Sequence, residues 1–291
     1  MLIATTIAEV RAAVREAKLA GRTVGLVPTM GALHEGHARL IELCRDSSDF
    51  RVVSIFVNPT QFGPNEDYSR YPRTWESDRA ICEQTGAHAV FLPGVDEMYP
   101  GLGRGEETVV AVPRISSILE GAIRPGHFQG VATVVSKLFN IVQPDLAWFG
   151  LKDYQQTVVI RRMVADLNMP VAIRLGETVR EPDGLALSSR NRYLDHQDRQ
   201  AAVILSQALR NAVDAVAAGE RDPDRVRQIF RTTIESQPRA QLDYAEVADA
   251  ETLERPERLG EGRSRVALLA VRFGSTRLID NALLPTTSGS R

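Results

Sequence analysis

The sequence lacks several features that would point to particular classes of protein. Only Cys44 and Cys82 are cysteine among 291 residues, so a disulfide scaffold is not expected and reduced, buried thiols are. The formal net charge is only -2, which leaves no excess of positive charge to attract nucleic acid or anionic lipid. No apolar run approaches the roughly 20 residues that a membrane-spanning helix needs. We therefore expect a cytoplasmic protein with no nucleic-acid or membrane partner.

Lysine is also scarce, because only Lys18, Lys137 and Lys152 are lysine among 35 Lys and Arg residues. A codon bias toward Arg is the simple explanation. A compact ammonium and a planar guanidinium are nevertheless not interchangeable. A lysine at a particular loop position therefore raises a question about function.

The chain does contain a regular alternation of short apolar runs and helical stretches from Thr23 onward. A strand-like start and an amphipathic helix precede it, and they do not resemble a signal peptide. Apolar runs bounded by Pro, Gly or Asn are typical of buried strands. Their alternation with helices predicts an α/β fold, a Rossmann-like doubly wound parallel sheet that binds ligands at the carboxyl ends of its strands. We expect strands at residues 23–29, 51–59, 89–94, 146–150 and 171–175, and helices at 36–47, 74–85, 128–142 and 154–168.

The pattern changes after residues 180–195, where two helical stretches are followed by three apparent strands. Helices followed by strands predict a smaller, separate α+β domain. We expect a first domain at residues 1–178 and a C-terminal lid domain at 179–291, with a disordered "TTSGSR" tail. The helices are expected at 197–218 and 223–235, and the strands at 242–248, 265–273 and 276–279.

Two histidines, His34 and His37, follow the first strong strand in "PTMGALHEGH" and lie where a helix should begin. Their spacing puts both imidazoles on one face within one turn, and the backbone N–H groups of the helix start point toward the same space. Gly31 and Gly36 would let the backbone approach a ligand closely. The segment therefore favours a polyphosphate site, with donors from the helix N-terminus and from the imidazoles.

Two other interpretations of this histidine pair stay open. Zinc is one, although it normally needs three protein ligands and no third His, Cys or carboxylate stands at a persuasive distance in the sequence. A pair of core histidines is the other. The glycine-rich passage from strand to helix favours phosphate over both.

His34, Gly36 and His37 form an H-x-G-H motif, which resembles that of Rossmann-like nucleotidyltransferases, including class I aminoacyl-tRNA synthetases. The chain is more similar still to the pantothenate synthetase (pantoate–beta-alanine ligase) family over most of residues 27–194. The similarity lies in "VPTMGALHEGH", "SIFVNPTQFGPNEDYSRYPRT", "RPGHFQGVATVVSKLFNIVQPD", "GLKDYQQ" and "DGLALSSRNRYL". It implies an ATP-dependent ligase of pantothenate biosynthesis that joins (R)-pantoate to beta-alanine through pantoyl adenylate and releases AMP and pyrophosphate. It also implies Mg2+ and a homodimer.

The same resemblance implies roles for individual residues. Catalytic roles fall on His34, His37, Lys152, Ser189 and Arg190. ATP contacts are expected at Met30, Gly31, Ala32, Leu33, His34, Glu35, Gly36, His37, Gly150, Leu151, Lys152, Asp153, Val179, Leu187, Ser188, Ser189 and Arg190. Substrate contacts are expected at Pro28, Thr29, Met30, Asn58, Gln61 and Gln156, and a Mg2+ contact at Asp78. The family commonly has Glu where this chain has Leu151, so no side-chain role is carried over to that position.

Each of these segments also has a simpler structural interpretation. Asn58 is typical of an Asx turn, and Lys152 and Asp153 could form a solvated ion pair. Asp78 at a helix start could act only as a cap or through the helix dipole. The Ser-Ser-Arg turn at 188–190 could be a solvated loop, although its place at the expected domain junction favours a closing lid.

Arg124 and His127, in "RPGHFQG", could help to line the pocket, and loop solvation or capping explains them equally well. Three rival functions also stay open. The nearest is adenylyl transfer to a phosphorylated substrate, although a phosphate would favour more Arg or Lys than "NPTQF" and "KDYQQ" offer. A tRNA-charging enzyme would need a basic surface and an anticodon-binding extension. A non-catalytic nucleotide sensor would keep the histidine loop without turnover.

Overall fold

The computed structural model describes residues 1–64, 66–103, 108–260 and 262–286. The chain divides into two compact units. Residues 1–151 and 155–177 form the first unit, and residues 152–154 and 178–291 form the second. The tail that was expected to be disordered lies outside the described residues from position 287 onward.

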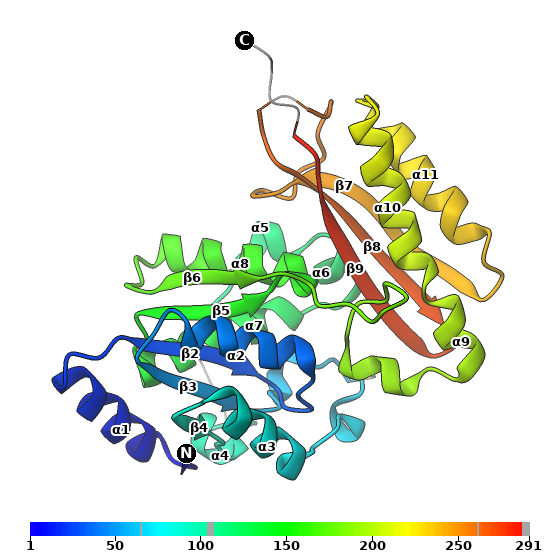
Figure 1. Cartoon of the computed structure of the whole chain (residues 1–291). Helices are drawn as coiled ribbons and strands as arrows, with labels where there is room; N and C mark the ends of the chain where they lie inside the picture. Colours follow the sequence, from blue (N-terminus) through cyan, green and yellow to red (C-terminus); the bar gives the residue numbers. More distant parts are fainter. Residues whose placement is uncertain (65, 104–107, 261, 287–291) are drawn as a thin grey trace. The chain divides into compact units, whose positions relative to one another are not determined.

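The first unit is built on a six-stranded parallel sheet with the strand order β1-β4-β3-β2-β5-β6 (Figure 1). Val27, Val53 and Val90 are fully buried, as expected for strands that are covered on both faces. The predicted Rossmann-like sheet is confirmed. Its strands are β1 (Leu2–Ala4), β2 (Val24–Thr29), β3 (Phe50–Ile55), β4 (Ala89–Phe91), β5 (Leu146–Gly150) and β6 (Ala172–Gly176).

Helices cover both faces of this sheet. On one face, α2 (Glu35–Arg45) and α3 (Trp75–Thr85) pack on the strands through Ile41 and Cys82. On the other lie α1 (Ile7–Leu19), α7 (His127–Val142) and α8 (Tyr154–Asp166), with short helices at Val95–Met98 (α4), Pro113–Ser116 (α5) and Glu120–Ile123 (α6). In the described parts of the chain, no helix combines the length and apolar character that crossing a membrane requires.

The two cysteines lie in the α2–α3 layer. Cys44 and Cys82 are both buried free thiols, as the sequence predicted. Burial raises the pKa of Cys44, and it raises the pKa of Cys82 to about 12. Both thiols are therefore neutral, and neither is suited to nucleophilic chemistry at neutral pH.

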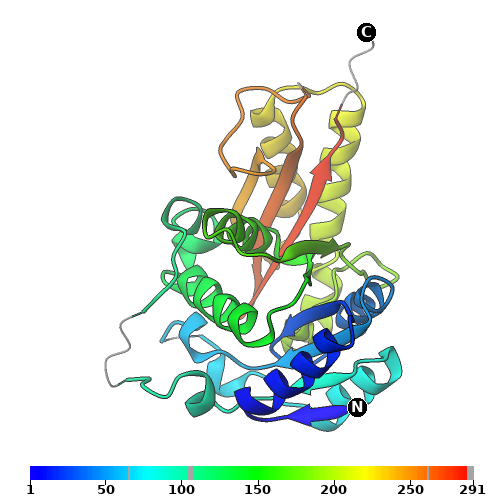
Figure 2. The same cartoon turned by 90° about the vertical axis from the view of Figure 1, so that its left-hand side faces the viewer.

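The second unit contains a three-stranded antiparallel sheet, β7 (Ala240–Asp249), β8 (Arg265–Phe273) and β9 (Thr276–Leu284), in sequential order. The helices α10 (Ile204–Ala217) and α11 (Pro223–Glu235) pack against it around Phe230 and Phe273 (Figure 2). The predicted smaller α+β architecture is confirmed.

Two differences from the sequence-based expectation in the second unit have a clear physical cause. The helix expected at 197–218 is divided into α9 (His196–Ala201) and α10, because Leu205 N donates to Ala202 O at 3.2 Å and tightens the chain into a turn. The last strand runs to Leu284 rather than 279. Its Asp and Asn residues have low strand propensity, but pairing with β8 as far as Arg265↔Leu284 overrides it.

Candidate active site

The candidate site lies at the carboxyl edge of the parallel sheet, where the strand order reverses. From β2 the chain steps through β3 to β4 on one side and later returns to β5 and β6 on the other. Doubly wound sheets bind ligands at such a switch point. The loop after β2 carries His34, the first turn of α2 carries His37, and the end of β5 carries Gly150, so the sheet brings two of the predicted ATP-binding segments to one edge.

The two histidines cap the start of α2. His34 Nδ1 accepts a hydrogen bond from the Gly36 N–H at 3.1 Å, and His37 Nδ1 accepts one from the His34 N–H at 3.3 Å. The ring centroids are 4.2 Å apart. Because each Nδ1 is an acceptor, each neutral imidazole carries its proton on Nε2. Both rings are then donors at Nε2, which is what a phosphate-binding imidazole requires.

Steric packing explains why the third position of the H-x-G-H motif is glycine. A Cβ at Gly36 would lie 2.9 Å from His34 Cε1 and 3.0 Å from its Nδ1. Any larger residue would displace the ring from its capping position. The motif is thus explained by the local packing of His34 against the first turn of α2.

The zinc interpretation receives no structural support. Both Nδ1 atoms of the pair already accept backbone hydrogen bonds. Within the described residues, no group of three His, Cys, Asp or Glu side chains is placed to hold a metal ion.

Asp78, the residue expected to contact Mg2+, contacts the histidine loop. It lies in the first turn of α3 and is only 1% exposed. Its Oδ2 accepts from Ala32 N at 3.0 Å, and its Oδ1 accepts from Leu33 N at 2.8 Å. Thr74 Oγ1 also donates to Oδ1, at 3.1 Å. The sequence gives no signal of this contact, because 46 residues separate Asp78 from Ala32.

The second expected contact segment follows β3, where Gln61 closes the short 3₁₀ helix η1 (Pro59–Gln61). Asn58 caps this helix through Thr60 N, as the Asx-turn interpretation predicted, and its Nδ2 donates to Gln61 Oε1 at 3.1 Å. Gln61 Nε2 in turn donates to Met30 Sδ at 2.9 Å. Asn58 therefore fixes the orientation of Gln61, and Gln61 lies against the loop that leads to the histidines.

Arg124 and His127 form a partly buried network behind Gln61. His127 Nδ1 lies 2.8 Å from the Gln61 carbonyl oxygen, and Arg124 Nη1 lies 3.1 Å from His127 Nε2. Burial, reinforced by the charge of Arg124, lowers the pKa of His127 to about 4. Arg124 also pairs with Glu66, at 2.5 Å. Burial raises the pKa of Glu66, but the hydrogen bonds and charge of Arg124 outweigh it and leave that pKa lowered. His127 is thus a neutral support for the Gln61 backbone.

The segment after β5 begins with the 3₁₀ helix η3 (Leu151–Asp153). Lys152 Nζ lies 3.6 Å from Asp153 Oδ1, so the ion pair foreseen as the simpler interpretation is present, although the Lys152 side chain is only 20% exposed. The Lys152 carbonyl accepts from Asn281 Nδ2 at 2.8 Å. Of the two glutamines that follow, Gln155 is buried and bonded to the backbone near α6, while Gln156 is partly exposed.

The Ser-Arg segment of the second unit, residues 188–190, follows a hairpin closed by the Arg180–Ala186 bridge. Leu187 N donates to Val179 O at 3.0 Å, and Arg199 ties the turn down through Asp183 and Glu181 at 2.7 and 2.6 Å. Ser188 then caps the 3₁₀ helix η4 (Ser189–Tyr193) by accepting from Arg190 N at 3.3 Å. The "PDG" sequence at residues 182–184 is therefore part of an anchored turn.

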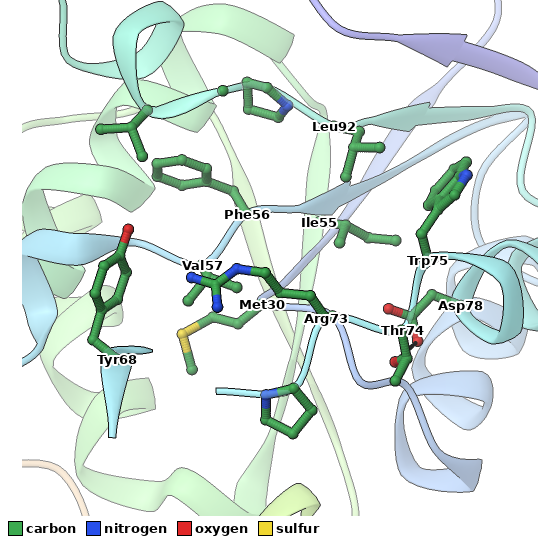
Figure 3. A pocket seen from close by; sticks show the side chains of 15 residues that line it. Met30, Ile55, Phe56, Val57, Tyr68, Arg73, Thr74, Trp75, Asp78 and Leu92 are labelled. Carbon is green, nitrogen blue, oxygen red and sulfur yellow. Dashed lines mark hydrogen bonds between the residues drawn. The ribbon is translucent and has the colours of Figure 1, made fainter. Parts of the chain in front are cut away.

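A cavity of about 280 Å³ lies beside the histidine loop, at the ends of β3 and β4 (Figure 3). Its wall is mostly apolar and includes Ile55, Phe56 and Trp75, and Arg73 lies at its polar side. Met30 and Gly31 of the loop also line it, together with Asp78. The loop therefore presents a thioether and a glycine to this cavity, and neither is a cation.

A doubly wound sheet with an H-x-G-H loop capped by its own imidazoles at the switch point defines a protein of the Rossmann-like nucleotide-binding class. Comparisons with known proteins narrow this class. The family model described as pantoate-beta-alanine ligase matches residues 2–283. The chain belongs to this family.

Individual relatives agree over nearly the whole chain. The pantothenate synthetases of Pelotomaculum thermopropionicum and Moorella thermoacetica are each 53% identical over 284 residues, which covers 98% of this chain and 99% of theirs. The crystal structure of pantothenate synthetase from Thermus thermophilus has a TM-score of 0.90 at 46% identity and covers 97% of this chain and 99% of that one. The pantoate-beta-alanine ligase of Francisella tularensis, complexed with beta-gamma ATP and beta-alanine, has a TM-score of 0.79 at 34% identity and covers 97% of each chain.

Proposed function

We propose that this protein is a pantothenate synthetase, which joins (R)-pantoate and beta-alanine at the expense of ATP. The family match over residues 2–283 carries this proposal. The capped histidine pair supports it, because it offers two Nε2 donors at the end of a helix whose dipole favours an anion.

The reaction has two steps. In the first, a carboxylate oxygen of pantoate attacks the α phosphorus of ATP, the bond to the β,γ-diphosphate breaks, and pyrophosphate leaves. In the second, the amine of beta-alanine attacks the acyl carbon of pantoyl adenylate, loses a proton, and displaces AMP. No protein nucleophile is required, so catalysis consists of positioning and charge stabilisation.

The first step places negative charge on the departing pyrophosphate, and we assign its stabilisation to His34, His37, Lys152, Ser189 and Arg190. His37 donates through Nε2, the nitrogen left with the proton by its own hydrogen bond from His34 N–H. Lys152 supplies a point charge, and Arg190 a forked cation suited to two phosphate oxygens. The backbone around Gly31, Gly150, Leu151, Asp153, Val179 and Leu187 binds the rest of the nucleotide. The second unit acts as the lid over bound ATP.

The acyl group occupies a mostly uncharged pocket formed by Pro28, Thr29, Met30, Gln61 and Gln156. Support comes from the chain of contacts in which Asn58 orients Gln61 and Gln61 contacts the Met30 sulfur. A glutamine amide can hydrogen-bond the hydroxyl groups of pantoate without adding a charge. Exclusion of water from such a pocket protects the reactive acyl adenylate from hydrolysis.

When bound with ATP, Mg2+ would supply neutralisation of charge on the phosphates. The described residues hold no three-carboxylate or similar cluster, which fits an ion that takes most of its ligands from phosphate and water. We also propose a homodimer and a cytoplasmic location, in line with the resemblance and the low cysteine content.

A product assay with ATP, pantoate and beta-alanine, each omitted in turn, tests the function. We expect pantothenate, AMP and pyrophosphate only when all three are present. Formation of ADP, or adenylyl transfer to a phosphorylated acceptor with no amine requirement, would refute the proposal. Tight ATP binding without any turnover would indicate a nucleotide sensor.

A further inference from the structure

The loop between β2 and α2 contains a strained turn. Gly31 has a φ of +81°, and Ala32, the next residue, has a φ of +50°. This region of φ is open to glycine, but in alanine it forces Cβ toward the backbone and persists only where surrounding contacts hold it. Ala32 is also fully buried, so water does not provide those contacts.

Thr29 Oγ1 accepts from Gly31 N at 3.2 Å, and a carboxylate on α3 accepts from the two residues that follow. Successive backbone N–H groups in a turn can point to one place and form an anion-binding nest. Here the N–H groups of Ala32 and Leu33 converge on the two oxygens of Asp78, at 3.0 and 2.8 Å. The chain's own carboxylate is therefore the anion in this nest. Ala32 and Leu33, although expected to contact ATP, use their N–H groups for Asp78.

The turn and the carboxylate are closely packed. A Cβ at position 31 would lie 3.0 Å from Asp78 Oδ2 and 3.1 Å from Ile55 Cγ2. Thr74 donates to Oδ1 of the same carboxylate at 3.1 Å, and both side chains lie on the cavity wall in Figure 3. Thr74, at the start of α3, thus fixes the Asp78 carboxylate, and this carboxylate in turn fixes the turn at Ala32 and Leu33.

We infer that Asp78 is a positioning residue for the ATP-binding histidines rather than a ligand of Mg2+. Its carboxylate fixes the backbone of Ala32 and Leu33, and the next residue, His34, is the N-cap of α2. The direction in which α2 starts, and with it the placement of His34 and His37, depends on that fixed turn. This inference rests on the proposed use of both histidines to bind ATP.

The Asp78→Asn variant tests it in the full-length protein. The side chain keeps its size, but its amide nitrogen cannot accept a hydrogen bond, so one of the two loop N–H groups faces a donor. We expect KM for ATP to rise about tenfold and kcat for adenylate formation to fall about tenfold, since a lost buried hydrogen bond has roughly this effect. KM for pantoate and the reaction of supplied pantoyl adenylate with beta-alanine should change less than about twofold.

Glu76→Gln is the matched control, because Glu76 is exposed in the same turn of α3 and loses the same charge without touching the loop. It should behave as the wild type. In the Asp78→Asn background, Ala32→Gly should restore part of the ATP KM, because glycine adopts the required φ without strain. This rescue distinguishes a role through the loop from a loss of general stability.

Unchanged ATP constants in folded Asp78→Asn would overturn the inference, as would the absence of rescue by Ala32→Gly. Recovery of activity at high Mg2+ would instead show a metal contact. If Asp78→Asn does not fold, Thr74→Val removes only the third hydrogen bond, and unchanged ATP constants in that variant would count against the inference. If the wild type makes no pantothenate, the proposed function is refuted. Equilibrium ATP binding by the same variants would then still test whether Asp78 positions the histidines.

Discussion

In the first unit the buried carboxylate of Asp78 accepts hydrogen bonds from a loop, whereas in the second unit the buried carboxylate of Asp280 accepts two from Arg180, at 2.7 and 2.9 Å. Both side chains are almost completely buried. One fixes the backbone that precedes the histidines, and the other joins β9 to the hairpin at residues 179–187. Buried charge therefore serves the site in one unit and the fold in the other.

Arginine suits the second use better than lysine. Arg180 contacts both oxygens of Asp280, and Arg255 contacts both oxygens of Glu246, at 3.0 and 2.6 Å. A guanidinium makes such two-point contacts because its donors are held in a planar fork, which an ammonium lacks. In this unit, two-point ion pairs that need a guanidinium thus give a structural reason for arginine in place of lysine, in addition to codon bias. Similar pairs join Arg227 to Glu246, Arg265 to Asp249, and Arg272 and Arg277 to Asp243.

Lys152 tests the comparison most strongly, because it belongs to the second unit and yet is proposed to stabilise charge on pyrophosphate. Lys152→Ala should slow pyrophosphate formation about 100- to 1,000-fold, as loss of a transition-state charge contact commonly does. The reaction of supplied pantoyl adenylate with beta-alanine should be nearly unchanged. Single-turnover measurements of both steps check this, with Lys18→Ala, a half-exposed lysine of α1, as the control. Equal losses in both steps would contradict the assignment.

Removal of the Asp280 carboxylate should affect stability rather than catalysis. Asp280→Ala leaves the Arg180 guanidinium without its two-point partner, and we expect the free energy of unfolding to fall by about 3 kcal/mol. Urea unfolding measures the loss. Arg225→Ala, at an arginine whose side chain is 75% exposed, should change stability by less than about 0.5 kcal/mol. A loss below about 1 kcal/mol for Asp280→Ala would contradict the claim that the buried Asp280 carboxylate stabilises the fold of the second unit.

His127 gives the first unit a dependence of stability on pH. Its pKa is about 4 in the folded chain, and that of an unfolded histidine is about 6.5. Between these values the unfolded chain binds the extra proton, so the stabilisation is fully present above pH 6.5 and is lost as the pH falls toward 4. Between pH 7.5 and 4.5, the wild type should lose on the order of 2 kcal/mol more than His127→Gln. Equal losses in denaturant titrations at the two pH values would show that His127 is not the group responsible.

The two buried glutamines provide the smallest contrast. Gln61→Ala should raise KM for pantoate about tenfold while the protein stays folded, because it removes the proposed hydrogen bond to the substrate. Gln155→Ala should instead lower the thermal midpoint, since Gln155 hydrogen-bonds the backbone at Ile115, Ile118 and Glu120. Steady-state kinetics and thermal unfolding of both variants separate the two effects. Unchanged saturation by pantoate in Gln61→Ala would exclude it from the acyl pocket.

Local patterns in the sequence predict the parallel sheet, its main helices and the histidine loop, because burial and helix starts follow from neighbouring residues. The contacts of Asp78 and Asp280 are not predictable in this way, since their partners lie 46 and 100 residues away. The extension of β9 and the break before α10 also depend on tertiary pairing. The site residues named from the resemblance remain predictions for the variants above to test.

The short helix η3 limits how the chain can be divided into separately folding fragments. Residues 152–154 belong to the second unit although residues 155–177 return to the first. Tyr154 donates its hydroxyl to Ala250 O at 2.8 Å, and Asn281 donates to Lys152 O at the same distance. A fragment that begins at residue 178 would therefore lose three residues of its own unit. Each unit is continuous in space but not along the chain, and a gene cut at one point cannot give both of them whole.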